Sequence, residues 1–435
     1  MSKDGYSLNL NSDFYFMKST PPFLIAFFAL VMAPLQADSV LQPHDMVAIC
    51  GDSITEQKQY SVFMEDYFLM CQPVAGLQSA QFGWGGERAQ GFLDRLESDV
   101  FPFKPTVVTT CYGMNDGWYA PMSQATGDAY RQAMTMAVEK LKTSGVRVIV
   151  IGSAGCVDGA AFINPRTSAD EYNKTLNALM EISKEVAGKE GVGFADVHTP
   201  MMEVMAKSKA AYGDKYQLVA GRGVHPNNNG HLVMAYAFLK GLGCDGSIGT
   251  ITVDLGAGKA EGTSGQKIVS CKNGTIKIES TRYPFCFQGD PGKPEQTTAS
   301  VLNFFPFNAD LNRYLLVVKG LKGSKARVTW GTVTKEFSAA DLAKGINLAA
   351  EFLVNPFCHQ FNKVNAAVQV QQAQETTLVK TFLHNLPAFK IKVPNSGAEL
   401  DKAAANRIAQ EKNLFAAAAA LVVPIDHTIK IKSEP

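Results

Sequence analysis

Short apolar segments alternate with longer segments of helical periodicity between residues 44 and 245. Apolar runs of strand length lie at Met46–Cys50, Thr106–Cys111, Val146–Ile151 and Val192–Val197. Near-continuous apolar strands separated by amphipathic helices are typical of a parallel sheet that is covered by helices on both faces. We therefore predict an α/β domain over residues 38–245.

The helical segments of this region carry their own start and stop signals. Gly127–Thr143 has apolar residues at helical spacing and ends before Gly145, a favoured residue just past a helix end. Ser168 followed three positions later by Glu171 is a capping-box pattern that predicts a helix to about Ala187. A last helix is expected after Asn229.

The pattern changes to strand-like alternation after Gly246. Asn273-Gly274 separates two alternating runs, as a type I′ turn does in a hairpin. Further strand-like runs are Thr250–Leu255, Leu315–Val318 and Arg327–Trp330. We predict a β-rich, sandwich-like domain over 246–337 and a helical C-terminal region over 338–435, packed on the β-rich domain, with a candidate closing strand at Thr428–Lys432.

The N-terminal segment has the order of a secretory signal. The apolar run Phe23–Val31 follows Lys18 and precedes the small-residue stretch Ala33–Ala37. We expect residues 1–37 to be a signal peptide, with residues 1–16 an upstream mis-start and Met17 the working start. A membrane anchor is the alternative. The predicted location is secreted or periplasmic, with no stable membrane insertion after cleavage.

Composition excludes several classes of function. The 435 residues carry a formal net charge of +1 and no basic run, which argues against nucleic-acid binding. The eight cysteines include no C-x-x-C pair, and no cysteine–histidine spacing is typical of a zinc site. We expect no metal and no cofactor. Disulfide pairing and oligomeric state stay open.

A candidate nucleophile follows the first predicted strand. The run Met46–Cys50 ends in Gly51-Asp52-Ser53, and ligands of open α/β sheets collect at the carboxyl ends of the strands. Gly51 permits a sharp turn, after which the backbone N–H of Ser53 is available to a developing negative charge. The alternative is an ordinary turn after a strand.

Two later segments supply the other groups that a serine nucleophile needs. His225, in Val-His-Pro-Asn, is a candidate general base, although most histidines in such folds have structural roles. Asn115, in Gly-Met-Asn-Asp after the second strand-like run, is a candidate oxyanion donor, with a loop or helix cap as the alternative. Gly86 offers a third donor through its backbone N–H, in a turn without a blocking side chain.

These segments occur in the order of the four sequence blocks of the SGNH (GDSL-type) hydrolases, which the chain resembles over roughly residues 44–245. The blocks are Gly51-Asp52-Ser53, Gly85-Gly86, Gly113–Asp116 and Val224–Asn227. The chain looks most like secreted bacterial members with an additional C-terminal β-plus-helix region. The resemblance implies a flavodoxin-like fold and a serine esterase. It implies that Ser53 attacks the ester and His225 takes its proton. The N–H groups of Ser53 and Gly86 and the side chain of Asn115 would hold the oxyanion, with Asp52 and Asp116 in supporting roles.

One position departs from the family pattern. The family usually has an aspartate three residues before the histidine, and Arg222 stands there in this chain. An arginine cannot accept the Nδ1 proton of an imidazole. Three outcomes remain open: a Ser–His dyad with a backbone carbonyl on Nδ1, a carboxylate recruited from elsewhere such as Asp214, and a slow or inactive enzyme.

The leading hypothesis is an exported serine ester hydrolase that works through an acyl-enzyme on small acyl esters and deacetylates carbohydrates. Its partner would be a small-molecule or polysaccharide ester. The alternatives are a catalytically impaired binding protein of the same fold and a lipase- or phospholipase-type esterase. Four aromatic residues flank the predicted site and either stack on sugar rings or pack internally: Trp84, Tyr112, Trp118 and Tyr119.

Overall fold

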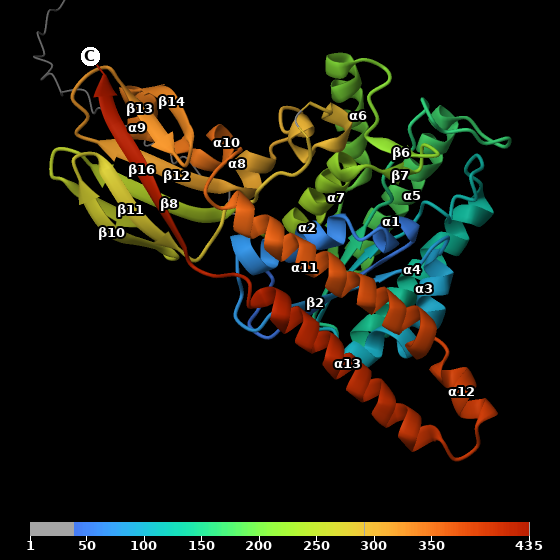
Figure 1. Cartoon of the computed structure of the whole chain (residues 1–435). Coiled ribbons are helices and arrows are strands. Elements are labelled where there is room, and N and C mark those ends of the chain that lie inside the picture. Colours follow the sequence, from blue (N-terminus) through green and yellow to red (C-terminus); the bar gives the residue numbers. More distant parts are fainter. Residues whose placement is uncertain (1–38, 291, 435) are drawn as a thin grey trace, which may run out of the picture. The chain divides into compact units, whose positions relative to one another are not determined.

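The structure is a computed structural model that describes residues 39–290 and 292–434 (Figure 1). The predicted signal peptide, residues 1–37, lies outside the described residues. No helix of the described part is long and apolar enough to cross a membrane.

Five parallel strands form the sheet of the α/β domain, in the order β2-β1-β3-β4-β5. Their bounds are Met46–Gly51 (β1), Gln78–Gly83 (β2), Val107–Cys111 (β3), Val148–Gly152 (β4) and Gly193–Ala195 (β5). β1 pairs with β2 on one side and β3 on the other, so the segment after β1 leaves from inside the sheet. The α/β prediction and its four strands are confirmed.

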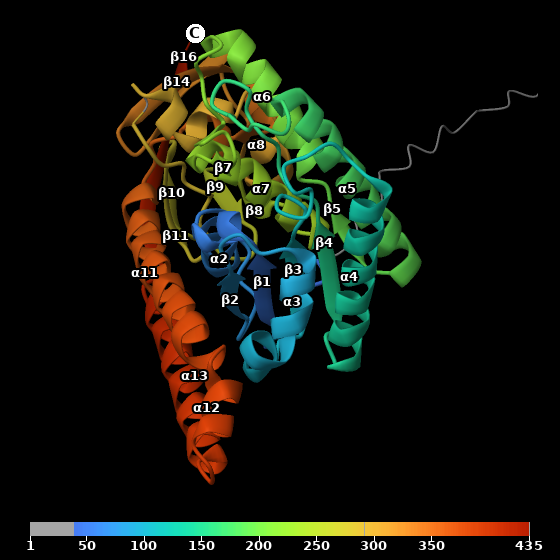
Figure 2. The same cartoon turned by 90° about the vertical axis from the view of Figure 1, so that its right-hand side faces the viewer.

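Helices cover both faces of this sheet, as the apolar strands require. Val47 and Ile49 of β1 belong to one buried cluster, whereas Ala48 and Cys50 belong to the other. The first cluster includes residues of α2 (Tyr60–Asp66), α6 (His198–Tyr212) and α7 (Asn228–Gly241). The second includes residues of α3 (Ala89–Arg95) and α4 (Gln124–Thr143), and α5 (Ala169–Glu190) contributes to both (Figure 2). Ser168 caps α5, its side chain accepting from the N–H of Glu171.

The edge strand β2 was not predicted, because its sequence is polar. Ser79 and Gln81 are buried, yet neither is apolar. The polar partners come from α11 (Cys358–Thr377), far along the chain. Glu375 accepts from the Gln81 N–H at 2.9 Å, and the Gln81 side chain donates to the carbonyl of Gln372 at 3.2 Å. A strand that is covered by a polar helix face lacks the apolar pattern of an internal parallel strand.

The β-rich part consists of two sheets. One has the order β10-β11-β16-β13-β14 and is antiparallel; the other has the order β15-β12-β8-β9. Their strands are Ser247–Asp254 (β8), Lys259–Gly262 (β9), Gln266–Lys272 (β10), Thr275–Ser280 (β11), Arg313–Lys319 (β12), Lys325–Trp330 (β13), Val333–Ser338 (β14), Ile346–Asn347 (β15) and Ile425–Glu434 (β16). The predicted hairpin turn is present, with φ of 50° at Asn273 and 71° at Gly274.

The boundary predicted at residues 337/338 does not separate a β-rich domain from a helical one. β16, the last strand of the chain, lies between β11 and β13 in the middle of the five-stranded sheet. The helices between β14 and β16 are therefore an insertion into the β-rich domain. We call residues 358–419, which comprise α11, η6 (Leu378–Leu383), α12 (Leu386–Lys392) and α13 (Gly397–Ala419), the helical arm.

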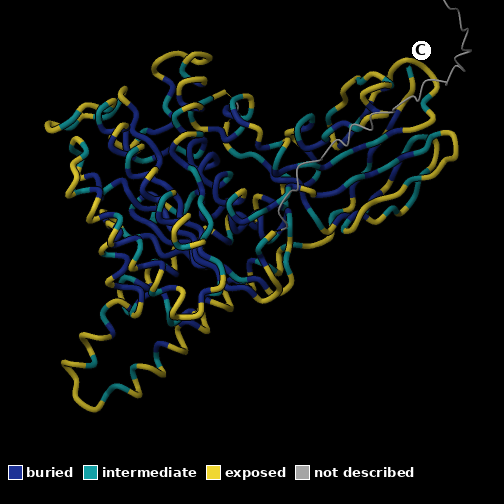
Figure 3. Tube along the Cα trace, turned by 180° about the vertical axis from the view of Figure 1, so that it is seen from behind, coloured by how far each residue is buried: buried dark blue, intermediate teal, exposed yellow. Residues whose placement is uncertain are grey.

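The helical arm packs on the α/β domain over most of its length. The start of α11 lies against the β-rich part, where the rings of Phe361 and Phe285 meet edge to face with centroids 5.1 Å apart. The rest of α11 contacts α2 and β2 (Figure 1). The tip between α12 and α13 is exposed (Figure 3).

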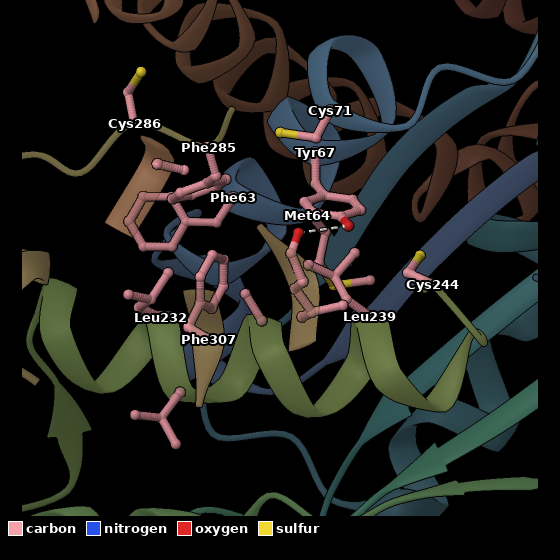
Figure 4. Packing of buried hydrophobic residues seen from close by; sticks show 14 of the residues in the cluster. Phe63, Met64, Tyr67, Cys71, Leu232, Leu239, Cys244, Phe285, Cys286 and Phe307 are labelled. Carbon is pink, nitrogen blue, oxygen red and sulfur yellow. Dashed lines mark hydrogen bonds between the residues drawn. The ribbon is translucent and has the colours of Figure 1, made fainter. Parts of the chain in front are cut away.

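A continuous apolar core joins the α/β domain to the β-rich part. Phe63 of α2 and Leu232 of α7 lie beside Phe285, from the loop after β11, and Phe307, the first residue of α8 (Phe307–Leu311) (Figure 4). The Tyr67 hydroxyl donates to the carbonyl of Leu311 at 2.8 Å across the same boundary. A buried, close-packed contact of this kind fixes the two parts relative to one another.

The contact between α11 and α2 contains three carboxyl groups that are buried among amides. Gln372 donates to Glu65 at 2.8 Å, Asn365 donates to Asp66 at 2.6 Å, and Gln371 donates to Glu375 at 2.9 Å. No ion pair to these carboxyls occurs among the residues that the structure describes. Burial raises the pKa of Asp66 to about 8 and also raises the pKa of Glu65 and Glu375. Hydrogen bonds between buried carboxyl groups and amides thus hold the arm in place, and burial favours the protonated form of these carboxyls.

We expect Asp66→Asn to make the stability of the chain less dependent on pH. The unfolded chain loses this proton near the ordinary aspartate pKa of about 4, whereas the folded chain keeps it up to about pH 8. The free energy of unfolding therefore falls as the pH rises between these two values. Urea unfolding at about pH 5.5 and about pH 8 should show a loss that is roughly 1–3 kcal/mol smaller in Asp66→Asn than in the wild type.

Asp214→Asn, which changes an exposed aspartate, is the control and should keep the wild-type loss. Equal losses in all three proteins would contradict a buried, protonated Asp66.

Candidate active site

Ser53 is the first residue of the short helix α1 (Ser53–Glu56), directly after β1. Asp52 caps this helix, its carboxylate accepting from the N–H of Ile54 at 2.9 Å. Gly51 must lack a side chain here, since a Cβ would lie 2.9 Å from the Cys111 carbonyl and 2.1 Å from the Thr55 hydroxyl. The tight turn presents Ser53 at the carboxyl edge of the sheet, half-buried and with its hydroxyl free to meet a partner from another loop.

That partner is His225, 172 residues later. The Nε2 atom of His225 lies 2.9 Å from Oγ of Ser53, the hydrogen-bond distance that a serine–histidine pair requires. His225 begins the two-residue strand β7 (His225–Pro226), which pairs with β6 (Val219–Gly221). The hairpin thus holds the imidazole of His225 beside Ser53, at the N-terminus of α1.

The other ring nitrogen of His225 faces a backbone carbonyl. Nδ1 lies 3.4 Å from the oxygen of Gly221, a long hydrogen bond. Arg222 is exposed and has a φ of 55°, in the left-handed region. Within the described part of the chain, no carboxylate forms a hydrogen bond with His225, and Asp214 is exposed without a recorded contact to it.

A second loop supports the histidine hairpin by close backbone approach. The Gly223 carbonyl accepts from the N–H of Asp158 at 2.9 Å. A Cβ on Gly223, which has a φ of +69°, would lie 2.4 Å from the backbone nitrogen of Phe162. Asp158 itself is fully buried and paired with Lys209. Only glycine fits this contact, so the position of the imidazole depends on it.

The Gly-Met-Asn-Asp block lies after β3, beside the serine. Asn115 Nδ2 donates to the backbone carbonyl of Glu87 at 3.0 Å and to the Asp52 carboxylate at 3.3 Å. Asp116 accepts from the N–H of Ala89 and from the N–H of Gly113, both at 2.9 Å. Asp116 therefore ties the loop of Asn115 to the start of α3, next to the Gly85-Gly86 turn.

Both supporting carboxyls are strongly buried. Burial raises the pKa of Asp52 to about 7 and that of Asp116 to about 6. The backbone N–H groups that they accept from act in the opposite direction. Gly86 is exposed, has a φ of +72°, and has open space where a side chain would be, so a ligand can approach its backbone.

Sequence reasoning missed the buried ion pair beneath this turn. Arg95 donates to both carboxylate oxygens of Glu87 at 2.7 Å, and the Tyr112 hydroxyl donates to the same carboxylate at 2.7 Å. Glu87 is the residue whose backbone carbonyl holds Asn115. The sequence signal was a glutamate and an arginine eight residues apart beside a glycine-rich turn. Such pairs are too common for this one to be identified as a buried ion pair from sequence alone.

The four flanking aromatic residues have different surroundings. Tyr112 is fully buried, and Tyr119 stacks on Tyr172 with centroids 5.0 Å apart, so these two pack internally. Trp118 is 50% exposed and has an unusual φ of 56°. The guanidinium of Arg88 lies 4.0 Å from its ring centroid, which links the Gly86 turn to the Asn115 loop.

The described residues contain no cluster of three histidine, cysteine, aspartate or glutamate side chains that is placed to hold a metal ion. The arrangement offers a hydroxyl, an imidazole and hydrogen-bond donors at one sheet edge. Such a set is suited to acyl transfer.

Comparison with known proteins agrees with this class. Residues 49–233 match the model of the GDSL-like Lipase/Acylhydrolase family. An acetylxylan esterase of Geobacillus stearothermophilus is 24% identical over 177 residues, which cover 39% of this chain and 74% of the relative. A solved gut microbial diltiazem-metabolizing enzyme shares the fold over 92% of this chain and 99% of its own, with a TM-score of 0.70 and 23% identity. The solved Geobacillus esterase Axe2 covers 46% of this chain and 95% of its own, with 22% identity and a TM-score of 0.39.

The fold and the family match define a carboxylic ester hydrolase. Over residues 49–233 the α/β domain matches the SGNH (GDSL-type) hydrolase family. The β-rich part and the helical arm are an extension that the solved diltiazem-metabolizing enzyme shares in fold.

We expect Gly223→Ala to displace His225 as well as to destabilise the chain. The new Cβ would overlap backbone atoms of Phe162 and Asp158 in addition to its left-handed strain. Gly191→Ala is the matched control, because Gly191 has a similar φ of +60° but open space around a Cβ. Gly191→Ala should cost roughly 1 kcal/mol and leave p-nitrophenyl acetate hydrolysis intact.

Gly223→Ala should cost roughly 2–4 kcal/mol and lower kcat at least tenfold, measured by urea unfolding and by the same ester assay. Identical behaviour of the two variants would show that the contact with Phe162 does not position the histidine.

Proposed function

We propose that the chain is an exported serine ester hydrolase that works through an acyl-enzyme and removes acetyl groups from carbohydrates. The observation that carries this proposal is the 2.9 Å distance between Ser53 Oγ and His225 Nε2 at the carboxyl edge of the sheet. Export rests on the signal-like sequence of residues 1–37. N-terminal sequencing of the mature protein tests that part.

In the first half-reaction, Ser53 Oγ attacks the ester carbonyl carbon while Nε2 of His225 takes the hydroxyl proton. The tetrahedral intermediate then collapses, the C–O bond to the alcohol breaks, and His225 returns the proton to the leaving oxygen. Water repeats the sequence on the acyl-enzyme and releases the acid and free Ser53. The buried His231 nearby stays neutral, since burial lowers its pKa to about 3, and so adds no repulsion to the imidazolium.

The oxyanion of the intermediate would accept from three donors: the N–H groups of Ser53 and Gly86 and the side chain of Asn115. The two existing bonds of Asn115 Nδ2 differ in length, 3.0 Å to Glu87 and 3.3 Å to Asp52. We infer that the oxyanion takes the place of Asp52 as an acceptor, because breaking the longer hydrogen bond costs less free energy than breaking the bond to Glu87. Glu87 then keeps the amide plane fixed while the charge develops.

The imidazolium would be stabilised by the Gly221 carbonyl rather than by a carboxylate. Nδ1–H points at a neutral oxygen 3.4 Å away, which fixes the tautomer but offers less charge stabilisation than an aspartate. The side chain of Arg222 is exposed, so solvent and ions weaken the effect of its charge on the imidazole. A Ser–His dyad is therefore the mechanism that we propose.

The carbohydrate substrate is supported by the sequence similarity to an acetylxylan esterase and by the polar surroundings of the serine. Asp52 and Asn115 lie beside the nucleophile, whereas a long acyl chain would need an apolar groove.

We expect Ser53→Ala to abolish hydrolysis of p-nitrophenyl acetate and of acetylated xylo-oligosaccharides. The alanine keeps the backbone N–H of the oxyanion site but removes the nucleophile, and the expected loss in kcat is roughly 10³-fold or more. Thr126→Ala, an exposed hydroxyl on α4, is the control. Equal hydrolysis by Ser53→Ala and the wild type would contradict Ser53 as the nucleophile, and no hydrolysis by the wild type would favour a binding protein of hydrolase fold.

We expect Arg222→Asp to change kcat by less than about tenfold, because Nδ1 already has an acceptor that fixes the tautomer. The measurement is the pH profile of kcat for p-nitrophenyl acetate in both proteins. A gain of a hundredfold or more would show that the missing carboxylate limits the rate and that Gly221 is an inadequate substitute.

A further inference from the structure

A cavity of about 430 Å³ begins at the oxyanion turn and follows one face of α3. Its lining includes Gly86 at one end, then Arg88, Asp94 and Ser98. Gly91, three residues after Arg88 and three before Asp94, also lines the cavity, and Ser98 follows Asp94 by four residues, so the lining runs along α3 and its continuation. The cavity thus shares Gly86 with the proposed oxyanion site, and its volume exceeds that of an acetyl group.

The opposite side of the cavity is closed by the helical arm. His384, which follows η6, lies with its ring centroid 4.5 Å from that of Trp84, and both residues line the cavity. Lys380 of η6 lies 4.7 Å above the same indole. Its ammonium group also forms an ion pair of 2.6 Å with Glu56 of α1, the helix that begins at Ser53. The arm thus contacts both the nucleophile helix and the cavity.

The hydrogen-bonding state of His384 follows from its neighbour. Nδ1 lies 3.1 Å from the buried Asp99 carboxylate and so donates to it. In a neutral imidazole the other nitrogen, Nε2, is then an acceptor, and the side chain is 40% exposed. Asp94, exposed on α3, offers a second acceptor beside its hydrogen bond of 2.8 Å from the side-chain amide of Gln90.

We propose that this cavity binds the sugar part of the ester, so that the helical arm completes the substrate site and His384 determines specificity for a polyol leaving group. The proposal rests on the proposed function, since it assigns the alcohol side of the same reaction. Sugar hydroxyls are donors that match the acceptors His384 Nε2 and Asp94. Arg88 supplies a donor, and the Trp84 indole supplies an apolar surface beside them.

An anionic alcohol part fits this cavity less well. Asp94 would repel it, and the guanidinium of Arg95 already has both carboxylate oxygens of Glu87 as partners. Among the lining residues a neutral, hydroxyl-rich group satisfies the largest number of polar atoms without burying an unpaired charge.

The test compares two esters that share the acetyl group and differ in the alcohol part. His384→Phe keeps an aromatic ring against Trp84 but removes the Nε2 acceptor. We expect kcat/KM for acetylated xylo-oligosaccharides to fall about three- to tenfold, the effect of one or two neutral hydrogen bonds. For p-nitrophenyl acetate, whose leaving group has no hydroxyl donors for the cavity, kcat/KM should stay within about twofold. His359→Phe, an exposed histidine on α11, is the matched control and should alter neither.

A binding measurement separates this proposal from the proposed function. Calorimetric titration of Ser53→Ala with unacetylated xylo-oligosaccharides should give a Kd that rises about three- to tenfold when His384→Phe is added. Failure of the wild type to hydrolyse either ester would contradict the proposed function, while the titration would still test the cavity. Absence of binding, binding that His384→Phe leaves unchanged, or an equal loss with both esters overturns the proposal.

Discussion

The pairing of the last strand with the middle of the β-rich sheet holds the rest of the extension in place. β16 bonds to β11 on one side and to β13 on the other, with Ile429 opposite both Ile276 and Trp330. The helical arm is consequently anchored at both ends, after β14 and before β16. Both ends of the arm are thus tied to the β-rich part, while the contacts of α11 with α2 and β2 hold it against the α/β domain. This long-range pairing also makes the fold one of high contact order.

The two contacts of the arm use different physical chemistry. Near its start the arm joins an aromatic core around Phe285 and Phe361, where burial of apolar surface provides the free energy. Along α2 and β2 it uses amide–carboxyl pairs such as Gln372 with Glu65. A shift of the helix by one residue would leave these buried groups unpaired, which costs more than the bonds contribute when made. The apolar end supplies stability, and the polar stretch sets the register that brings His384 to Trp84.

The sequence predicts the α/β domain well because each element there follows a local rule. Apolar runs mark β1, β3 and β4, and Ser168 with Glu171 marks the start of α5. The features that escaped prediction depend on distant partners. β2 is buried through Gln81 and Glu375, which are 294 positions apart. β16 contains the predicted closing strand Thr428–Lys432, but its place in the middle of a sheet that begins at residue 266 was not predicted. No local pattern indicates such pairs, so the sequence predicts most of the strands but not that the chain returns after residue 337 to complete the β-rich sheet.

The same distinction applies to the site. Ser53 and His225 were predicted from their motifs, and Oγ of Ser53 lies 2.9 Å from Nε2 of His225. The partner of Nδ1 is a backbone oxygen, and a backbone contact of this kind leaves no residue pattern in the sequence. The hairpin register that pairs Gly221 with His225 creates this contact, and Gly223 keeps it by docking on Phe162. In the proposed dyad the orientation of the base is therefore a property of backbone geometry. A substitution at residue 222 leaves that geometry intact as long as the new residue tolerates a φ of 55°. The replacement of the usual aspartate by Arg222 is then compatible with an ordered histidine. What is lost is only the stabilisation that a carboxylate would give to the positive charge of the imidazolium.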